Sequence, residues 1–406
     1  MNKPRVAILH YRAPPTIGGV ESTIGTHARL FADHGYSVKV IAGRGEVFDP
    51  RVEFTCIPEI DSREPNVEAI QKELNAGVVP PAFNALNDTL THKLESALQE
   101  TDVLIAHNAV TLHKNLALTA ALYRLSEKNR VQLIAWCHDF AWDDPVYADD
   151  LHAGLPWDLL RAPWANVQYV VVSEARREEL ARLLKIDSSQ IAVVPPGIDA
   201  CEFLGVTPTT AQWIDQFALL DAAPLLLLPA RVTRRKNIEL AIDITAGLQT
   251  AGLHPKLVVM GPLGPHNPKN RAYLEELKQR AASTERADTV LFLQEYGAVN
   301  DTVRRDLYAI ADALLFPSAR EGFGIPILEA GLARLPIFCA DIPPVRESAH
   351  ELAHYFALDE PPAQIANRMI EFFRSDSRYQ LKQRVIRTYS WNPIFQEQIE
   401  PLVNPP

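Results

Sequence analysis

Four cationic side chains fall within six residues of the segment Arg231–Asn237, RVTRRKN, which follows the apolar run Leu225–Leu228. The four are Arg231, Arg234, Arg235 and Lys236. A solvated basic loop is the common fate of such a run. The alternative is an anion site, in which Arg231 as a bidentate fork and Lys236 as a point charge neutralise a diphosphate. Such a pair would also stabilise charge growing on a phosphate leaving group.

A second segment with chemical potential is Arg320–Glu329, REGFGIPILE, after the apolar run ALLFPS. Gly322 and Gly324 allow close backbone approach to a ligand, and Pro326 suits the first turn of a helix. A glycine loop that opens a helix presents unpaired N–H groups and the positive end of the helix dipole, which attract phosphate.

Two carboxylates, Glu321 and Glu329, flank this glycine loop. Eight residues along a helix rise about 12 Å, whereas the carboxyl pair of a glycosidase is about 5–9.5 Å apart. We therefore interpret the two as separate groups that hold hydroxyls. A tight turn with two solvent-facing glutamates is the alternative.

The first half of the chain offers weaker signals. Gly18 and Gly19 precede a helix without the G-x-G-x-x-G spacing of a dinucleotide fingerprint, which argues against a nicotinamide or flavin domain. His138-Asp139 opens a segment in which four of the six tryptophans fall within 29 residues: Trp136, Trp142, Trp157 and Trp164. Aromatic faces and carboxylates suit a sugar or polyol, but packing of the tryptophans and a backbone-bonded histidine are equally simple explanations.

Several familiar motifs are missing from the sequence. It has no Asp-x-Asp, no His/Cys spacing for zinc, no G-x-S-x-G and no P-loop. We therefore expect no metal site and no cofactor.

The elements that position these residues alternate between strand and helix. In the first half we predict strands at Arg5–Tyr11, Ser37–Arg44, Asp102–Asn108, Val131–Asp139, Val167–Ser173 and Gln190–Val194, with helices such as Val20–His34, Leu112–Lys128 and Glu174–Lys185. After the Pro/Thr-rich stretch Pro195–Pro208 we predict strands at Pro224–Arg231, Lys256–Gly261, Thr289–Tyr296, Ala313–Ser318, Pro336–Ala340 and His354–Leu358. The helices there are Asn237–Gly252, Arg271–Ser283, Asp301–Ala311, Pro326–Ala333 and Pro362–Arg374.

The predicted strands are continuously apolar rather than alternating, which is typical of parallel sheets covered on both faces. Two such arrays in succession predict an α/β fold of two doubly wound, Rossmann-like domains. Ligands bind beyond the carboxyl ends of parallel strands. We therefore expect the polar residues that follow the strands to line a cleft across which the domains face each other.

Composition narrows the class of protein. The chain has 406 residues, 47% hydrophobic and 22% charged, and a formal net charge of −10. A chain this acidic has no general attraction for nucleic acid or anionic lipid. It lacks a bilayer-spanning run or signal peptide, and its four cysteines are scattered, so we expect a reduced, cytoplasmic protein. Four basic residues of Glu174–Lys185 could make peripheral membrane contact, but interleaved glutamates favour a solvated face.

Taken together, these motifs resemble the retaining GT-B glycosyltransferases, and most closely glycosyltransferase family 4. The resemblance covers nearly the whole chain. It runs from GGVE through HD, VVVSE, VVPPGID, ARVTRRKN and VVMGP to EGFGIPILEAGLARLPIFCADIPPVRE at Glu321–Glu347. The last of these blocks is the specific one, and the others follow in the expected order.

The resemblance implies roles for individual residues. Arg231 and Lys236 would hold the diphosphate of a nucleotide-sugar, Glu321 the sugar hydroxyls and Glu329 the ribose. His138 would orient the sugar and, with Glu321, Arg231 and Lys236, form the catalytic set. Backbone near the donor is expected at Gly18, Gly19, Gly261, Gly322, Phe323, Gly324 and Ile325. The acceptor is expected near His107, Asp139, Trp142 and Tyr147.

The resemblance also implies the domains and the reaction. Residues 1–199 would form the acceptor domain, with helix 379–406 packing back on it, and residues 200–378 the nucleotide-sugar domain. The reaction would be metal-independent, retaining transfer of a hexosyl unit from a UDP- or GDP-sugar to a hydroxyl of a sugar, polyol or lipid-linked acceptor. A sugar-nucleotide epimerase, a phosphorylase or a non-catalytic carbohydrate-binding relative are the alternatives.

Overall fold

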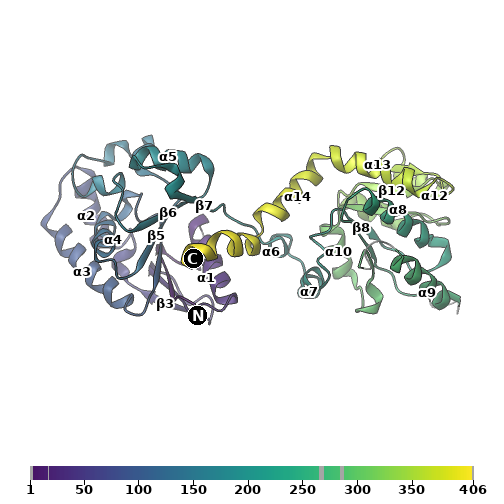
Figure 1. Cartoon of the computed structure of the whole chain (residues 1–406), viewed down its shortest axis with the longest axis horizontal. Coiled ribbons are helices and arrows are strands. Elements are labelled where there is room, and N and C mark those ends of the chain that lie inside the picture. The colour runs from purple at the N-terminus through teal and green to yellow at the C-terminus, as the bar shows by residue number, and fades with distance from the viewer. Residues whose placement is uncertain (1–2, 17, 265–268, 284–287, 405–406) are drawn as a thin grey trace. The chain divides into compact units, whose positions relative to one another are not determined.

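The computed structural model describes residues 3–16, 18–264, 269–283 and 288–404. The chain divides into two compact units (Figure 1). Unit 1 comprises Met1–Gly197 and Trp391–Pro406, and unit 2 comprises Ile198–Ser390. The return to unit 1 thus falls at Trp391, so residues 379–390 of the expected returning helix belong to unit 2 and residues 391–406 belong to unit 1.

Unit 1 is built on a parallel sheet of seven strands in the order β3-β2-β1-β4-β5-β6-β7. The strands are β1 (Val6–Arg12), β2 (Val38–Arg44), β3 (Val52–Cys56), β4 (Val103–His107), β5 (Gln132–Cys137), β6 (Val167–Val171) and β7 (Ile191–Val193). The helices are α1 (Gly19–Asp33), α2 (Pro65–Asn75), α3 (Pro81–Ala97), α4 (Leu116–Lys128) and α5 (Glu174–Leu184). The order of the strands reverses between β1 and β4.

Both faces of this sheet are covered, as continuously apolar strands require. One buried core lies under α2, α3, α4 and α5, and a second lies under α1 (Figure 1). The second core includes the end of the chain, α15 (Trp391–Ile394), a π-helical turn at Phe395–Ile399 and α16 (Glu400–Val403). Gly197 admits the Trp391 ring where the chain returns, since a Cβ there would lie 2.5 Å from it.

Unit 2 has a parallel sheet of six strands in the order β10-β9-β8-β11-β12-β13. The strands are β8 (Leu225–Leu228), β9 (Lys256–Val259), β10 (Val290–Phe292), β11 (Ala313–Phe316), β12 (Ile337–Ala340) and β13 (His354–Phe356). The helices are α6 (Ala200–Leu204), α7 (Pro208–Phe217), α8 (Ile238–Thr250), α9 (Lys269–Ala282), α10 (Asp301–Ile310), α11 (Ile325–Leu332), α12 (Pro343–Ala349), α13 (Pro362–Ser375) and α14 (Ser377–Tyr389).

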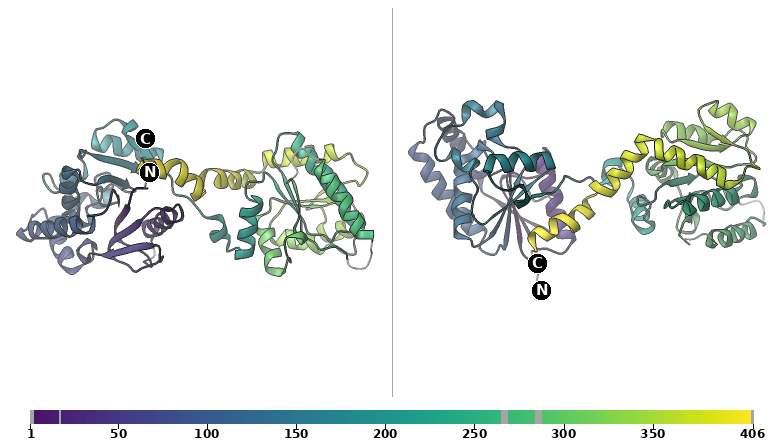
Figure 2. Two further views of the ribbon diagram at one scale, coloured as in Figure 1. Left: turned by 60° about the horizontal axis from the view of Figure 1, so that its bottom comes forward. Right: turned by 45° about the horizontal axis from the view of Figure 1, so that its top comes forward.

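This sheet too is covered on both faces (Figure 2). One core gathers α8, α9 and α13, and the other gathers α7, α10, α11 and α12. The expectation of two doubly wound, Rossmann-like units is therefore confirmed. The order of the strands reverses between β8 and β11, and such a switch point is where ligands of open parallel sheets bind.

Candidate functional site

The four cations that follow β8 separate into different environments. Three of them lie in the short 3-10 turn Arg234–Lys236, where their side chains point toward different partners. Arg234 turns toward α9, where it binds Glu276 at 2.6 Å and lies over the Tyr273 ring. Lys236 turns the other way and pairs with Glu321, in the loop after β11. The switch point thus brings together the RVTRRKN and EGFG segments.

The Lys236–Glu321 ion pair is nearly buried, with side-chain exposures of 9% and 8%. The ammonium also lies 5.3 Å from the centroid of the Phe316 ring. Burial lowers the pKa of Lys236, and the Glu321 carboxylate opposes that shift. Arg235 adds a second cation, 3.5 Å from the other carboxylate oxygen, and donates to the carbonyl of Arg320 at 3.1 Å. The loop holding Glu321 is therefore fixed by two cations.

Arg231 is exposed and has no ion pair within the described part of the chain. Its backbone lies against the loop after β9, where Val232 N–H donates to the Pro262 carbonyl at 3.0 Å. A Cβ on Gly261 would lie 2.0 Å from the Ala230 carbonyl oxygen. Gly261 thus permits close contact between two loops, which accounts for this glycine without any ligand.

The N-terminus of α11 is open. Gly324 occupies its N-cap at φ +97°, a left-handed conformation that favours glycine, and no side chain caps the helix. Phe323 and Ile325 are exposed, and a Cβ on Gly322 would meet no described atom within 4 Å. Two buried hydroxyl oxygens near the switch point, on Thr233 and Ser318, have no hydrogen-bond partner among the described residues.

Glu329, on α11, is held from α10. It accepts a hydrogen bond from the Tyr308 hydroxyl at 2.7 Å, and Arg304 lies 3.5 Å from its other oxygen. Burial, followed by the bond to Glu329, raises the pKa of Tyr308. No sequence signal pointed to Tyr308 or Arg304, because residues on an amphipathic helix look like core and solvent positions.

In unit 1, the residues after β4 hold the residues after β5. The Asn108 side-chain oxygen accepts from the backbone N–H of His138 at 2.7 Å and of Asp139 at 3.2 Å. Its amide donates to the Asp139 carboxylate at 3.1 Å. His107 is fully buried, and its Nδ1 lies 3.1 Å from Nε2 of His138. His107 therefore reaches a ligand only through His138. Asn108, the last residue of the predicted strand Asp102–Asn108, was not among the expected site residues.

Gly18 and Gly19 follow β1 at the start of α1. Gly18 is extended, and a Cβ on it would meet only the Glu21 side chain. Gly19 has no described atom within 4 Å of such a Cβ. Neither glycine is thus demanded by the fold of unit 1, which leaves close approach to a ligand as their expected use.

Most of the aromatic residues near His138 pack in or against the hydrophobic core of unit 1. Trp136, Trp157 and Trp164 are no more than 4% exposed, so burial explains them. Trp142 is half-buried, donates from its indole N–H to the Trp157 carbonyl at 3.2 Å, and lies under the Arg161 guanidinium. Tyr147 packs against the same core. Their expected contact with an acceptor remains a prediction.

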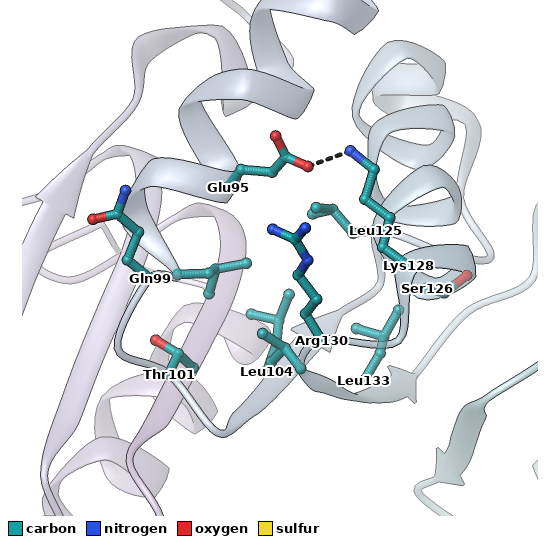
Figure 3. A pocket seen from close by; sticks show the side chains of 11 residues that line it. Glu95, Gln99, Thr101, Leu104, Leu125, Ser126, Lys128, Arg130 and Leu133 are labelled. Atoms are coloured by element: carbon teal, nitrogen blue, oxygen red, sulfur yellow. Dashed lines mark hydrogen bonds and ion pairs between the residues drawn. The ribbon is translucent and has the colours of Figure 1, made fainter.

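A cavity of about 200 Å³ in unit 1 lies away from these residues (Figure 3). Its walls include Thr101 and Leu104 at the start of β4 and Leu133 at the start of β5. Lys128 and Glu95 form an ion pair at its side. The cavity is thus at the amino ends of the strands, the opposite edge from His107 and His138.

The sequence also raised the questions of membrane contact through α5 and of a metal site. On α5, Arg176 pairs with Glu179 at 2.8 Å and Arg177 with Glu174 at 2.5 Å, which favours a solvated face. Within the described ranges, each helix is too short or too polar to cross a bilayer. Those same ranges contain no group of three or more His, Cys, Asp or Glu side chains placed to share a metal ion.

Comparison with known families defines the class. A family described as Glycosyltransferase Family 4 matches residues 17–201, and one described as Glycosyl transferases group 1 matches residues 209–388. The two matches cover unit 1 and unit 2 almost completely, so the chain is a glycosyltransferase. It belongs to glycosyltransferase family 4, with the two doubly wound units of the GT-B fold.

Individual relatives are distant. The chain is 26% identical over 363 residues to mannosylglucosylglycerate synthase of Thermotoga maritima, covering 82% of this chain and 79% of that protein. It is 30% identical over 172 residues to D-inositol 3-phosphate glycosyltransferase of Actinosynnema mirum, covering 42% and 40%. The crystal structure of Anabaena HepE in complex with UDP is 16% identical, covering 98% and 100%, with a TM-score of 0.36.

Proposed function

We propose that this chain is a retaining, metal-independent transferase that moves a hexosyl unit from a UDP- or GDP-linked sugar to a hydroxyl acceptor. One observation carries the proposal: at the switch point of unit 2, Arg235 and Lys236 meet Glu321 beside the uncapped N-terminus of α11, and Arg231 follows the same strand, β8. Cations, a helix N-terminus and a fixed carboxylate together suit a molecule that joins a diphosphate to a polyol.

The diphosphate is proposed to bind between the loop after β8 and the N-terminus of α11. Arg231 supplies a guanidinium that no carboxylate of the described residues neutralises. Lys236 supplies an ammonium already held in place by Glu321. Because the Lys236 ammonium is held before the ligand arrives, it needs little reorganisation to stabilise developing charge.

The carboxylates are proposed to bind the two sugars of the donor. Glu321 accepts from hydroxyls of the transferred hexose, and Glu329 from hydroxyls of the ribose. Glu329 is supported by Tyr308, which orients the carboxylate and leaves its other oxygen near Arg304. His138 is proposed to orient the hexose, and Gly18 and Gly19 to allow backbone to approach the donor. Asp139, Trp142 and Tyr147 remain the proposed acceptor residues.

The proposed transfer breaks the bond between the anomeric carbon and the β-phosphate oxygen. The acceptor oxygen forms its bond to that carbon on the same face, and its proton passes to the departing phosphate oxygen. The charge that grows on the diphosphate is stabilised by Arg231, Lys236 and the α11 dipole. These positive groups are the reason for proposing that a divalent ion is dispensable.

The relatives support the class of substrate. Two share the name mannosylglucosylglycerate synthase and one the name D-inositol 3-phosphate glycosyltransferase. These names indicate glycosyl transfer onto small hydroxylated molecules. A sugar or polyol acceptor is therefore proposed ahead of a lipid-linked one.

Thermal unfolding against a panel of UDP-, GDP- and ADP-sugars tests the donor. A ligand that binds only the folded chain raises its melting temperature. A UDP- or GDP-sugar should do so, whereas no shift with any member of the panel would contradict the proposal. With the donor identified, NMR of the product should show the donor's anomeric configuration, and EDTA should leave transfer intact. Inversion would refute retention, and a strict Mg²⁺ or Mn²⁺ requirement would refute metal independence.

A further inference from the structure

Four histidines gather at the carboxyl edge of the unit 1 sheet. His10 lies in β1 two residues before its end, His27 is on α1, His107 ends β4 and His138 follows β5. His10, His27 and His107 are at most 6% exposed. The His107 ring lies 5.5 Å from those of His27 and His138, centroid to centroid, and stacks on Trp136. Such a group of imidazoles must distribute its protons in a defined way.

The hydrogen-bond partners of the ring nitrogens indicate where the imidazole protons lie. His10 Nδ1 faces the His107 carbonyl oxygen at 2.9 Å, so that nitrogen carries a proton. His107 Nδ1 faces His138 Nε2 at 3.1 Å, and one proton lies between them. Burial lowers the pKa of His138 to about 4 and that of His107 well below its ordinary value, so both rings are neutral near pH 7. Either ring could donate.

The surroundings of His107 decide which ring donates. Its Nε2 is buried and has no hydrogen-bond partner among the described residues. If His138 donated, neutral His107 would carry its proton on this Nε2, leaving a buried N–H without an acceptor. If His107 donates from Nδ1, its Nε2 is a bare lone pair. Orphaned buried donors are the rarer and costlier arrangement, so the second state is favoured.

The consequence falls on His138. With Nε2 accepting, its proton must sit on Nδ1. That nitrogen has no hydrogen bond within the described part of the chain, nor is it among the buried unpartnered atoms, so it is open to a ligand. The backbone of His138 is meanwhile held by Asn108, so the ring has a fixed position as well as a fixed proton.

We propose that His107 is a positioning residue that sets the tautomer of His138, so that His138 presents an Nδ1–H donor to a ring or hydroxyl oxygen of the transferred sugar. This inference rests on the proposed function for its purpose. The tautomer itself is a property of the protein without substrate and can be measured separately.

The test is long-range ¹H–¹⁵N NMR of the full-length chain with ¹⁵N-labelled histidine at pH 7.5. The His138 signals are assigned by their loss in His138→Gln. In the wild type, His138 should carry its proton on Nδ1. In His107→Phe, which keeps a ring but no nitrogen, the His138 proton should move at least partly to Nε2. His27→Phe is the matched control, because His27 touches the His107 ring without bonding to His138, and it should leave the tautomer unchanged.

An Nε2–H tautomer in the wild type would overturn the inference, and so would an unchanged tautomer in a folded His107→Phe variant. Should that variant not fold, the wild-type spectrum alone decides. With an identified donor, His107→Phe should lower kcat at least tenfold and leave the Kd for the nucleoside diphosphate unchanged. Absence of any nucleotide binding by the wild type would instead refute the proposed function, whatever the tautomer.

Discussion

Lys236 and Glu321 depend on each other because each side chain is about nine-tenths buried. Removing one partner of such a pair leaves a buried charge without compensation. In Glu321→Gln, the ammonium loses the carboxylate that opposes the depression of its pKa. We expect the free energy of unfolding to fall by about 1–3 kcal/mol, measured by chemical denaturation.

The same variant should respond to alkaline pH. A lysine whose folded pKa is depressed is destabilising while it is charged, so stability should recover as the pH rises through its folded pKa toward 10.5. Glu276→Gln is the matched control, since Glu276 pairs with Arg234 at the surface and is 55% exposed. It should change stability by no more than about 0.5 kcal/mol. If both variants lost the same free energy of unfolding, burial of the Lys236–Glu321 pair would make no extra contribution to stability.

The buried histidines predict acid sensitivity of unit 1. Burial lowers the pKa of His27 to about 3 and of His138 to about 4, from an ordinary 6.5. Below pH 6.5 the unfolded chain therefore binds protons that the folded chain does not, and stability is lost as the pH falls toward 4. The slope is about 1.4 kcal/mol per pH unit for each ring that stays neutral.

Urea unfolding at pH 7 and pH 5, followed by tryptophan fluorescence, checks this sensitivity. Five of the six tryptophans are in unit 1, so the signal reports mainly on it. In His27→Phe, the loss of stability between these pH values should be smaller by about 2 kcal/mol, since one titrating ring is gone. An undiminished loss would show that His27 is not neutral in the folded chain.

Among the elements, α11 depends on the backbone conformation of its N-cap residue, Gly324. Gly324 has φ +97°, and a side chain there is strained whatever the space. Gly324→Ala should therefore destabilise the chain by about 1–2 kcal/mol and weaken nucleoside diphosphate binding, because the N–H groups of the first turn move. Thermal unfolding and titration calorimetry measure the two effects.

Gly331, near the end of the same helix, provides the control. It has ordinary helical backbone, and a Cβ added to it would meet no described atom within 4 Å. Gly331→Ala should stabilise the helix by about 0.5–1 kcal/mol and leave binding unchanged. If Gly324→Ala bound the nucleotide as tightly as Gly331→Ala does, the N-terminus of α11 would not be part of the site.

Strands were the most predictable elements. The predicted Ala313–Ser318 and Lys256–Gly261 correspond to β11 and β9, because a run of apolar residues in a parallel sheet has a distinctive composition. The edge strand β3 was not predicted, since Val52–Cys56 is half-exposed and lacks such a run. Pairing between distant elements was also beyond reach, as with Tyr308 and Glu329, because nothing in local spacing joins α10 to α11.

For the four cations after β8, the sequence predicted the location but not the partner of each side chain. Their position after a strand predicted that they would lie at the carboxyl edge, which is correct. Which of their side chains face Glu321 depends on the turn Arg234–Lys236 and on the acidic residues of α9. Both depend on tertiary structure, so the sequence could not show that Lys236 faces Glu321 and Arg234 does not.

At the scale of the whole molecule, unit 1 is completed by the end of the chain. Phe395 is fully buried against Phe31, with ring centroids 5.0 Å apart, and stacks on His34 at 4.2 Å. Removing a buried phenyl ring costs about 3–5 kcal/mol. Phe395→Ala should therefore lower the stability of unit 1, followed by tryptophan fluorescence, and preserve nucleoside diphosphate binding by unit 2. Loss of binding in the folded variant would mean that the nucleotide site is not confined to unit 2.

Unit 2 is proposed to bind a nucleoside diphosphate through specific cations of the run Arg231–Lys236. Titration calorimetry of UDP and GDP against the wild type, Arg231→Ala and Arg234→Ala tests it most directly. Arg231 has no carboxylate partner among the described residues, whereas Arg234 is engaged by Glu276. Because a charged hydrogen bond is worth about 1.5–3 kcal/mol, we expect Arg231→Ala to bind ten- to a hundredfold more weakly and Arg234→Ala to bind as the wild type does. Equal affinities for all three proteins would contradict the account.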